Sequence, residues 1–283
     1  MRARRLRDRC FWGLGALALM LIVAPALSVL ISVFHQAAPS LGWSLLTKAT
    51  NGAGGGLRNA MLGTLLLLLG VLVVAGTIGV AAGIYLAEMA GPRVGGVLRF
   101  FSEVLAGMPS IVIGYVGYVS LVVEFHWGYS LLAGVLALSV LVLPYVVRTT
   151  EVALRQVPTA LSEASAALGV SRGRTVARIL LPTAIPGIAS GLIVALAIST
   201  GETAPLLFTA GFLDGHNPSL SLFHHQVPYL TYVTFTDTSL PGRSAHQLAA
   251  AAGAMTLAIL VVLIVLGRIV AGRARRQTDR MSL

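Results

Sequence analysis

Six long apolar runs, separated by shorter polar segments, dominate the pattern of this chain. They cover residues 11–34, 62–86, 105–123, 129–147, 188–212 and 248–270. A helix needs about 20 apolar residues to cross the hydrocarbon layer of a bilayer, and each run is close to that length or exceeds it. We therefore expect an all-α integral membrane protein with six transmembrane helices. The composition agrees, because 56% of the residues are hydrophobic and only 11% are charged.

The first apolar run follows five arginines, an order that secretory signal peptides share. This run is longer than a typical signal-peptide core, and no clear cleavage site follows it. We interpret residues 11–34 as a retained first helix, with a signal peptide as the alternative.

The basic residues lie mainly on one side of this six-span arrangement. Cytoplasmic segments of membrane proteins are enriched in Lys and Arg, so this side and both termini are expected to be cytoplasmic. Residues 1–10 and 271–283 would then be tails of a transmembrane domain at 11–270. The other side has only Lys48, Arg58 and Arg243. Of the 20 basic residues, 17 lie on the expected cytoplasmic side: Arg2, Arg4, Arg5, Arg7, Arg9, Arg93, Arg99, Arg148, Arg155, Arg172, Arg174, Arg178, Arg268, Arg273, Arg275, Arg276 and Arg280.

The net charge of +10 could also indicate a nucleic-acid partner. Nucleic-acid binding needs the basic residues on one folded surface, whereas here they flank apolar spans, so we expect contact with membrane lipid and none with nucleic acid. No P-loop, nucleophile elbow or metal-binding pair is present, and the adjacent His224 and His225 lack the spacing of a metal site. We predict no catalytic residue, no metal and no cofactor in this chain, and no enzymatic activity of its own.

The polar connection at residues 148–187 is too long for a simple turn. Pro158 and Gly169 bracket a short predicted helix, and Ser171 can cap a second helix that would end at Leu181-Pro182. We expect a helix-turn-helix outside the membrane, with an amphipathic helix on the lipid surface as the alternative. The first helix has an apolar face made by Val157, Leu161, Ala164 and Leu168.

This connection resembles the EAA loop of the permease subunits of ABC importers. Glu163-Ala164-Ser165, Gly169, Ile179 and Leu181-Pro182 match its spacing, and only Ser165, in place of Ala, departs from it. The resemblance implies a type I importer permease fold in which this loop contains a coupling helix. In that family the loop contacts the ATPase subunit, which binds ATP and Mg²⁺. The residues expected to couple to the ATPase are therefore Glu163, Ala164, Gly169, Ile179, Leu181 and Pro182.

Other segments resemble the phosphate-specific (Pst) permeases of the bacterial plasma (inner) membrane. They lie at residues 63–66, 83–88, 107–114, 148–151 and 201–210. The resemblance implies uptake of inorganic phosphate by two different permease subunits, two ATPase subunits and an extracytoplasmic phosphate-binding protein. Family members commonly carry arginine four residues before the Glu of Gly-Glu-Thr-Ala-Pro, where this chain has Ile198. Either the second permease subunit supplies the positive charge, or the transported oxyanion differs.

Four residues are expected to line or gate the translocation pathway. Glu202 lies in or near the end of the fifth span, where an ionisable group is costly and indicates function. It would repel phosphate directly, so we expect it to gate or to pair with a base on the partner subunit, the alternative being a carboxylate at the outer interface. Thr203 adjoins it, and Pro205 should end or bend the helix beside it. Ser110 could line the pore, although close helix packing explains it more simply.

Two other functions stay open from the sequence. A permease for sulfate or molybdate would have the same general pattern; the segment at residues 201–210 favours phosphate, whereas Ile198 weakens that interpretation. A stand-alone secondary transporter would need paired broken helices and inverted repeats, and we find no convincing repeat.

Overall fold

The computed structural model describes residues 2–52 and 54–281, with side chains for 11–52, 54–269 and 272. Helices account for most of this part of the chain, as the sequence predicted. The elements are α1 Arg2–Ala37, η1 Ala38–Ser40, α2 Trp43–Thr47, β1 Thr50–Asn51, β2 Gly54–Gly55, α3 Arg58–Glu88, α4 Pro92–Ala106, α5 Ser110–Gly117, η2 Tyr118–Glu124, α6 Leu131–Arg155, α7 Thr159–Ala167, α8 Arg172–Thr175, η3 Val176–Leu180, α9 Leu181–Gly201, α10 Ala204–Thr209, α11 Leu230–Ser239 and α12 Arg243–Met281.

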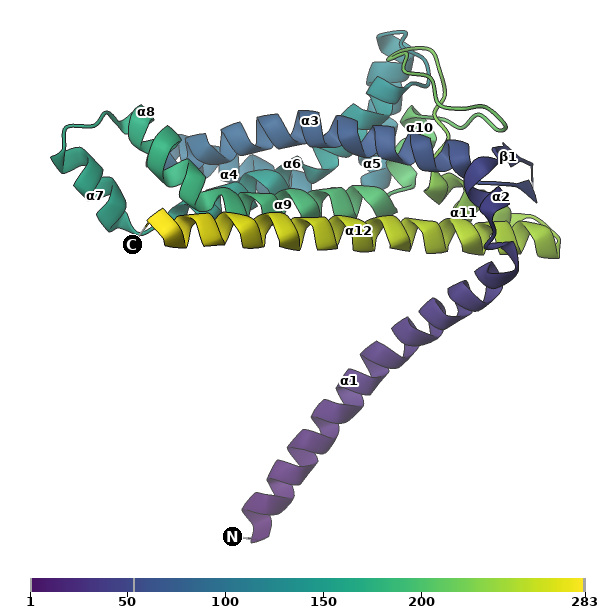
Figure 1. The fold of residues 1–283 in the computed structure, drawn as a ribbon, viewed down its shortest axis with the longest axis horizontal. Helices are drawn as coiled ribbons and strands as arrows, with labels where there is room; N and C mark the ends of the chain where they lie inside the picture. Colours follow the sequence, from purple (N-terminus) through teal and green to yellow (C-terminus); the bar gives the residue numbers. More distant parts are fainter. Residues whose placement is uncertain (1, 53, 282–283) are drawn as a thin grey trace.

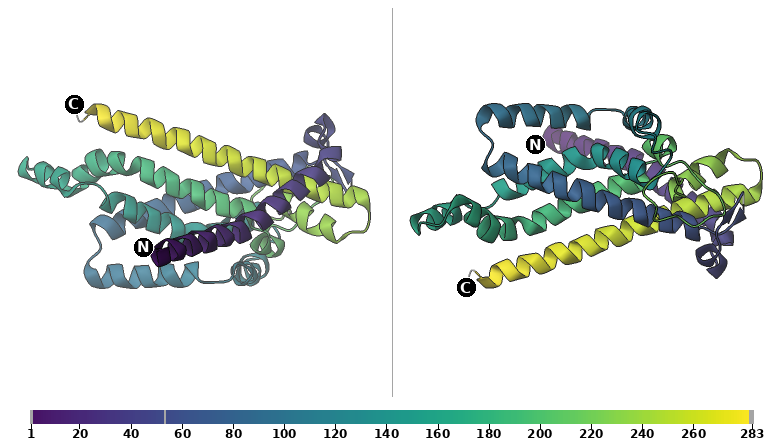
Figure 2. Two further views of the ribbon diagram at one scale, coloured as in Figure 1. Left: turned by 90° about the horizontal axis from the view of Figure 1, so that it is seen from below. Right: turned by 90° about the horizontal axis from the view of Figure 1, so that it is seen from above.

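Helices α3, α6, α9 and α12 run side by side along the long axis of the molecule (Figures 1 and 2). Their shared core consists mainly of Leu, Val and Ala side chains, among them Leu67, Val142 and Leu196. Five helical stretches are long and apolar enough to cross a membrane: Phe11–Ser40, Arg58–Glu88, Leu131–Arg155, Arg172–Gly201 and Arg243–Ile269. Helices long and apolar enough to span a membrane therefore lie where the first, second, fourth and sixth apolar runs predict them. The chain is a multi-pass membrane protein.

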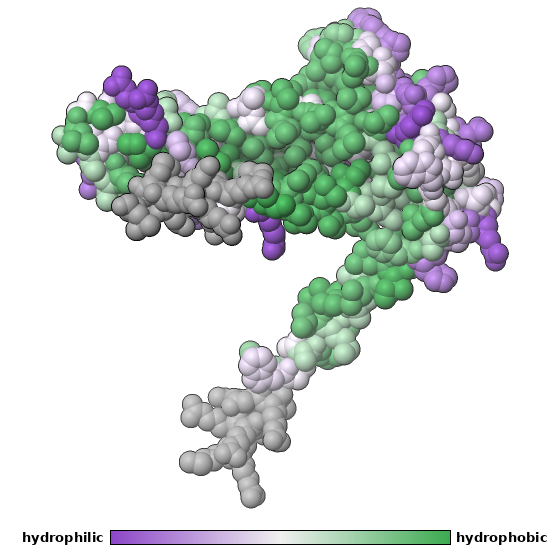
Figure 3. All heavy atoms as spheres, in the orientation of Figure 1, coloured by the Kyte–Doolittle hydropathy of each residue, from purple (hydrophilic) through white to green (hydrophobic). Residues whose placement is uncertain are grey.

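Helix α1 leaves this bundle and projects away from it (Figure 1). It begins at Arg2, so the expected N-terminal tail at residues 1–10 is continuous with the first helix from there on. The helix is apolar along most of its length (Figure 3), and none of its most hydrophobic window is buried by the rest of the chain. Its outer face is therefore left to lipid or to other subunits.

The third predicted span, residues 105–123, is wrong as a straight helix. It starts inside α4, and the chain breaks at residues 107–109 before α5 and η2 continue at 97° to α4. Pro109 explains the break, because its ring disfavours helical geometry at Met108 and it has no N–H to donate. With this bent pair counted as one span, the chain has up to six spans.

The fifth predicted span and the helix before it are also placed differently. The second helix of the loop does not end at Leu181-Pro182, but continues through the π-helical turn η3 into α9. Pro182 directly follows this π-helical turn, and a local π adjustment accommodates a residue without an N–H inside a continuous helix. At its other end, α9 stops at Gly201, well before the predicted limit at Phe212.

The end of the bundle opposite α7 contains α2, the β1–β2 hairpin and α11 (Figure 1). The two strands are antiparallel, with Thr50 paired to Gly55 and Asn51 to Gly54. The buried Asn59 of α3 holds this hairpin, because its side chain accepts a hydrogen bond from the Thr50 backbone N–H (3.0 Å) and donates to the Thr50 hydroxyl (2.9 Å). This end is the expected extracytoplasmic face, since α7 belongs to the expected cytoplasmic loop.

Candidate functional site

Helix α7 forms a projecting knob at one end of the molecule (Figure 1). Its apolar residues Leu161 and Leu168 are exposed, Leu168 by 83%. Glu163 and Ala164, two of the predicted coupling residues, are exposed on the same helix. A short helix with uncovered apolar side chains can fit a groove on another protein.

Gly169 makes the turn that ends this knob. Its φ of +71° lies in the left-handed region, which a residue with a Cβ adopts only at a cost of about 1–2 kcal/mol. The Gly169 N–H donates to the Ala166 carbonyl (2.9 Å), and the Val170 N–H to the Ser165 carbonyl (3.1 Å). The predicted helix stop at Gly169 is confirmed, and the left-handed backbone there shows why the helix ends at a glycine.

The other three predicted coupling residues lie at the root of the knob. Ile179 and Leu181 are half-buried and pack against a small core that includes Leu154 and Leu180, and Pro182 is also half-buried. These side chains fix the knob to the bundle, whereas Glu163, Ala164 and the Gly169 turn are available for contact with a partner.

A buried pair of hydroxyl groups joins the two sides of the knob. The Ser165 Oγ on α7 lies 2.7 Å from the Thr175 Oγ1 on α8, and the two residues are 3% and 4% exposed. Ser165, the residue at which this chain departs from the EAA pattern, therefore links the two helices. The alanine usual at this position has no hydroxyl and could not form this bond.

A charged cluster lies where the end of α6 meets α4. The Glu151 side chain is only 2% exposed, and three guanidinium groups surround it. Arg99 Nε is 2.8 Å from Glu151 Oε1, Arg155 Nη2 is 2.9 Å from the same oxygen, and Arg148 Nη1 is 3.5 Å from Oε2. Arg148 and Arg155 follow from helical spacing, whereas Arg99 arrives from a separate helix.

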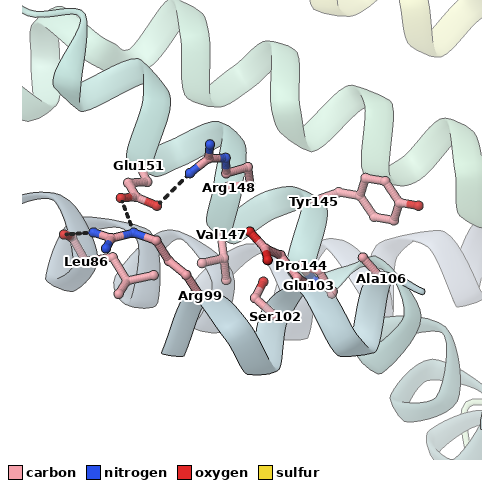
Figure 4. A pocket seen from close by; sticks show the side chains of 10 residues that line it. All are labelled: Leu86, Arg99, Ser102, Glu103, Ala106, Pro144, Tyr145, Val147, Arg148 and Glu151. Carbon is pink, nitrogen blue, oxygen red and sulfur yellow. Dashed lines mark hydrogen bonds and ion pairs between the residues drawn. The ribbon is translucent and has the colours of Figure 1, made fainter. Parts of the chain in front are cut away.

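This cluster borders a cavity of about 200 Å³ between α4 and α6 (Figure 4). Arg99, Arg148 and Glu151 point toward one another at one end of it, and Ser102 and Glu103 lie farther along α4. Two arginines, Arg99 and Arg148, and two carboxylates, the buried Glu151 and the exposed Glu103, line this cavity, and Arg155 contacts Glu151 from outside the lining. The Arg148 and Arg155 side chains are 65% and 55% exposed, which leaves guanidinium N–H groups free to bind an oxyanion in bidentate geometry.

The break between α9 and α10 lies beside α5, the helix that follows the break at Pro109. Glu202 and Thr203 form the break between α9 and α10, and Pro205 lies in the first turn of α10, so the predicted helix end beside Glu202 is confirmed. Helix α10 packs directly on α5, because a Cβ added at Gly114 would lie 2.7 Å from the Pro205 Cα. Ser110 is the first residue of α5, so the two helices that carry the predicted pathway residues are brought together.

The surroundings of Glu202 are incomplete in the isolated chain. Its side chain is half-buried, and within the described residues it forms no ion pair. Its backbone carbonyl accepts a hydrogen bond from the Thr231 hydroxyl of α11 (2.9 Å). Ile198, one turn earlier on α9, packs against the main apolar core of the bundle, so no positive charge reaches Glu202 from that position.

Glu151 and its arginines form a buried ion cluster that the sequence reasoning did not predict, although residues 148–151 were part of the Pst resemblance. The signal was present in part, because Arg148, Glu151 and Arg155 are spaced by three and four residues on a helix. Arg99 is 52 positions from Glu151, and nothing local indicates that the two meet.

Comparison with known proteins identifies the family of this chain. Residues 79–276 match the family described as binding-protein-dependent transport system inner membrane component. The chain is 46% identical to the phosphate transport system permease protein PstA 2 of Mycobacterium bovis over 98% of its length and 91% of that protein. It is 37% identical to the phosphate transport system permease protein PstA of Xylella fastidiosa, covering 83% of this chain and 82% of that one.

Solved structures give the same fold at low sequence identity. A chain of the bacterial alginate ABC transporter has a TM-score of 0.63 at 14% identity and is covered over 94% of its length by 93% of this chain. A chain of the MetNI methionine ABC transporter has a TM-score of 0.58 at 17% identity, over 77% of this chain and 94% of that one. With its exposed α7 knob, its bundle of membrane helices and these matches, the chain belongs to the inner membrane components of binding-protein-dependent transport systems, the permease subunits of ABC importers.

Proposed function

We propose that this chain is a transmembrane subunit of an ATP-driven importer of inorganic phosphate. The observation that carries the proposal is the 46% identity to a phosphate transport permease over 98% of the chain. The arginine cluster around Glu151 supports it, because guanidinium groups bind phosphate through paired hydrogen bonds.

The knob and α9 form the route by which ATP hydrolysis drives transport in this proposal. The exposed face of α7 binds an ATPase subunit, and that subunit holds ATP and Mg²⁺. The helical stretch Arg172–Gly201 runs without interruption for 30 residues, about 45 Å, from the knob to the Glu202–Thr203 break. A displacement of the knob is therefore transmitted along this continuous helical stretch, which includes the π-helical turn η3 and Pro186, to the break between α9 and α10.

Four partner chains complete the importer in this proposal. They are a second, different permease subunit, two ATPase subunits and an extracytoplasmic phosphate-binding protein. The half-buried Glu202 supports the second permease subunit, because a carboxylate near the membrane is stabilised by a basic group, which the partner would supply. Both termini and the α7 knob lie in the cytoplasm, and protease protection of reporter tags at the two termini tests this orientation.

A related function, import of sulfate or molybdate, is favoured by one observation. Ile198 packs in the apolar core at the position where phosphate permeases commonly carry arginine. All three substrates are oxyanions that arginines can hold, so the fold and the Glu151 cluster fit each of them.

ATPase activity of the assembled complex in nanodiscs tests the proposal. Binding protein loaded with phosphate should stimulate ATP hydrolysis, and binding protein loaded with sulfate should not. A complex lacking this chain, measured in parallel, gives the background. Equal stimulation by both anions would mean that the importer accepts oxyanions in general and not phosphate alone. No stimulation by either anion would contradict the proposal that the complex is an importer.

A further inference from the structure

A second cavity, of about 270 Å³, lies at the end of the bundle opposite the knob. It is bordered by the β1 strand, by the segment after α10, and by α11. Its polar lining comes from Thr50, Asp214, Thr236 and Asp237. None of the nine residues that the structure places around it is basic, so the cavity has the opposite charge to the arginine cluster.

Asp237 is the least satisfied of these groups. It is 5% exposed, and its Oδ2 has no hydrogen-bond partner among the residues that the structure describes. Burial, with a smaller contribution from Asp214, raises the pKa of the Asp237 carboxyl above its usual value. A buried carboxylate without a partner is costly, so a cation that enters the cavity is stabilised by pairing with it.

Asp214 and two aromatic rings complete the lining. The Gly52 N–H donates to Asp214 Oδ2, which fixes this exposed carboxylate at the mouth of the cavity. The rings of Phe212 and Tyr232 stack with centroids 4.1 Å apart and an angle of 7° between their planes. Aromatic faces attract cations, and planar guanidinium groups also stack on them.

We propose that this cavity binds a single organic cation, a guanidinium or primary ammonium group, between Asp237, Asp214 and the Phe212–Tyr232 stack. The cation enters from the extracytoplasmic side and pairs with the two carboxylates. Its source is either a free amine or an Arg or Lys side chain of a protein that docks on this face.

A metal ion fits the lining less well. Calcium takes six to eight oxygen ligands, and magnesium requires nearly octahedral oxygens. Within the described residues no group of three or more His, Cys, Asp or Glu side chains is placed to hold a metal, and this cavity has two carboxylates. The aromatic stack also has no use in a site for a hard metal, whereas it matches an organic cation.

The test measures binding of methylguanidinium to the complex in nanodiscs by saturation-transfer NMR, with uncharged methylurea as the matched control ligand. Wild-type protein should bind methylguanidinium and not methylurea. Asp237→Asn keeps the shape of the side chain and should weaken binding by about tenfold or more, because a charge-assisted contact is lost. Asp214→Asn and Phe212→Leu should each weaken it by less, and Glu124→Gln, an exposed carboxylate outside the cavity, should not change it.

Thermal unfolding checks that both proteins are folded. If wild type and Asp237→Asn then bind methylguanidinium equally, the proposal is overturned. Failure of wild type to bind would also overturn it, as would binding of calcium at this site in place of methylguanidinium. Because Asp214→Asn alters an exposed group, it remains informative if Asp237→Asn does not fold.

A second arm distinguishes the two sources of the cation. Docking of the extracytoplasmic binding protein is measured with and without methylguanidinium. If methylguanidinium inhibits docking of the wild type but not of Asp237→Asn, the cation is a side chain of the docked protein. If docking is unchanged while methylguanidinium binding still depends on Asp237, the cation is a free amine. Only this arm rests on the proposed function, so failure of the NMR titration and failure of phosphate import are separate results.

Discussion

Glu151 and Glu202 are two carboxylates at opposite ends of the helical bundle, and their surroundings differ. Glu151 is buried and has three arginines of its own chain around it. Glu202 is half-buried at a helix break and has no ion pair within the described residues. The comparison indicates that Glu151 finds its countercharges within this subunit, whereas Glu202 finds none among the described residues, which supports the second permease subunit proposed above.

The largest expected effect is that of Glu151→Gln. The variant keeps the side-chain shape but leaves three neighbouring arginines without their shared countercharge. We expect uptake by the assembled complex to fall by roughly tenfold or more, and the free energy of unfolding of this chain to fall by about 2 kcal/mol because charge-assisted hydrogen bonds are lost. Uptake of radiolabelled phosphate and thermal unfolding measure the two effects. Glu124→Gln is the control, and an effect no larger than that of the control would contradict a structural role for the cluster.

Glu202→Gln should separate transport from stability. No partner of Glu202 within this chain is lost, so unfolding of the isolated subunit should change by less than about 0.5 kcal/mol. Uptake should fall several-fold, because the basic group expected on the second permease subunit loses its carboxylate. The same uptake and unfolding assays apply. A clear loss of stability in the isolated subunit would show that Glu202 is satisfied within its own chain, and the comparison with Glu151 would fail.

Gly169→Val tests the knob at the same end as Glu151. A side chain at φ +71° is strained by about 1–2 kcal/mol, so the turn should deform and binding of the ATPase subunit should weaken. Co-purification of the ATPase with this chain gives the measurement. Gly173→Val is the matched control, because Gly173 lies in α8 with nothing within 4 Å of an added Cβ and without a positive φ. Normal ATPase binding by Gly169→Val would exclude the knob as the coupling element.

The sequence predicted elements that depend on local chemistry. Apolar run length was sufficient for four spans, and the helix stop at Gly169 followed from a glycine placed after a short helical segment. The break before Pro109 was missed because apolar residues continue across it, and apolar content does not distinguish a bent helix from a straight one. Pro182 suggested a helix end that does not occur, because the π-helical turn η3 accommodates the proline and the helix continues into α9.

The candidate site was less predictable for a related reason. The contacts of the candidate site and of the second cavity join residues far apart in the chain: Arg99 contacts Glu151 across 52 positions, and Gly52 contacts Asp214 across 162. Helical spacing indicates which residues share a face, but which helix covers that face depends on tertiary packing. Ser165 was predictable in part: the sequence shows that it departs from the EAA pattern, but it does not show that its hydroxyl contacts Thr175.

Ser165→Ala should have the smallest effect. It restores the residue usual at this EAA position and removes the hydrogen bond to Thr175, so the loop should lose about 1 kcal/mol of stability. Hydrogen exchange of the α7 amides measures this loss. Ser162→Ala, on the exposed side of the same helix, is the control. If the double variant with Thr175→Ala loses the sum of the two single effects, the hydroxyl pair contributes nothing.

Uptake of radiolabelled phosphate into proteoliposomes tests the central claim most directly. The complex is reconstituted with its ATPase and binding protein, with ATP on the ATPase side and excess sulfate or molybdate as competitor. We predict uptake that requires ATP, is abolished by unlabelled phosphate, and is unchanged by the two other oxyanions. Inhibition by sulfate or molybdate as strong as that by phosphate, or uptake without ATP, would contradict the assignment of this chain to an ATP-driven phosphate importer.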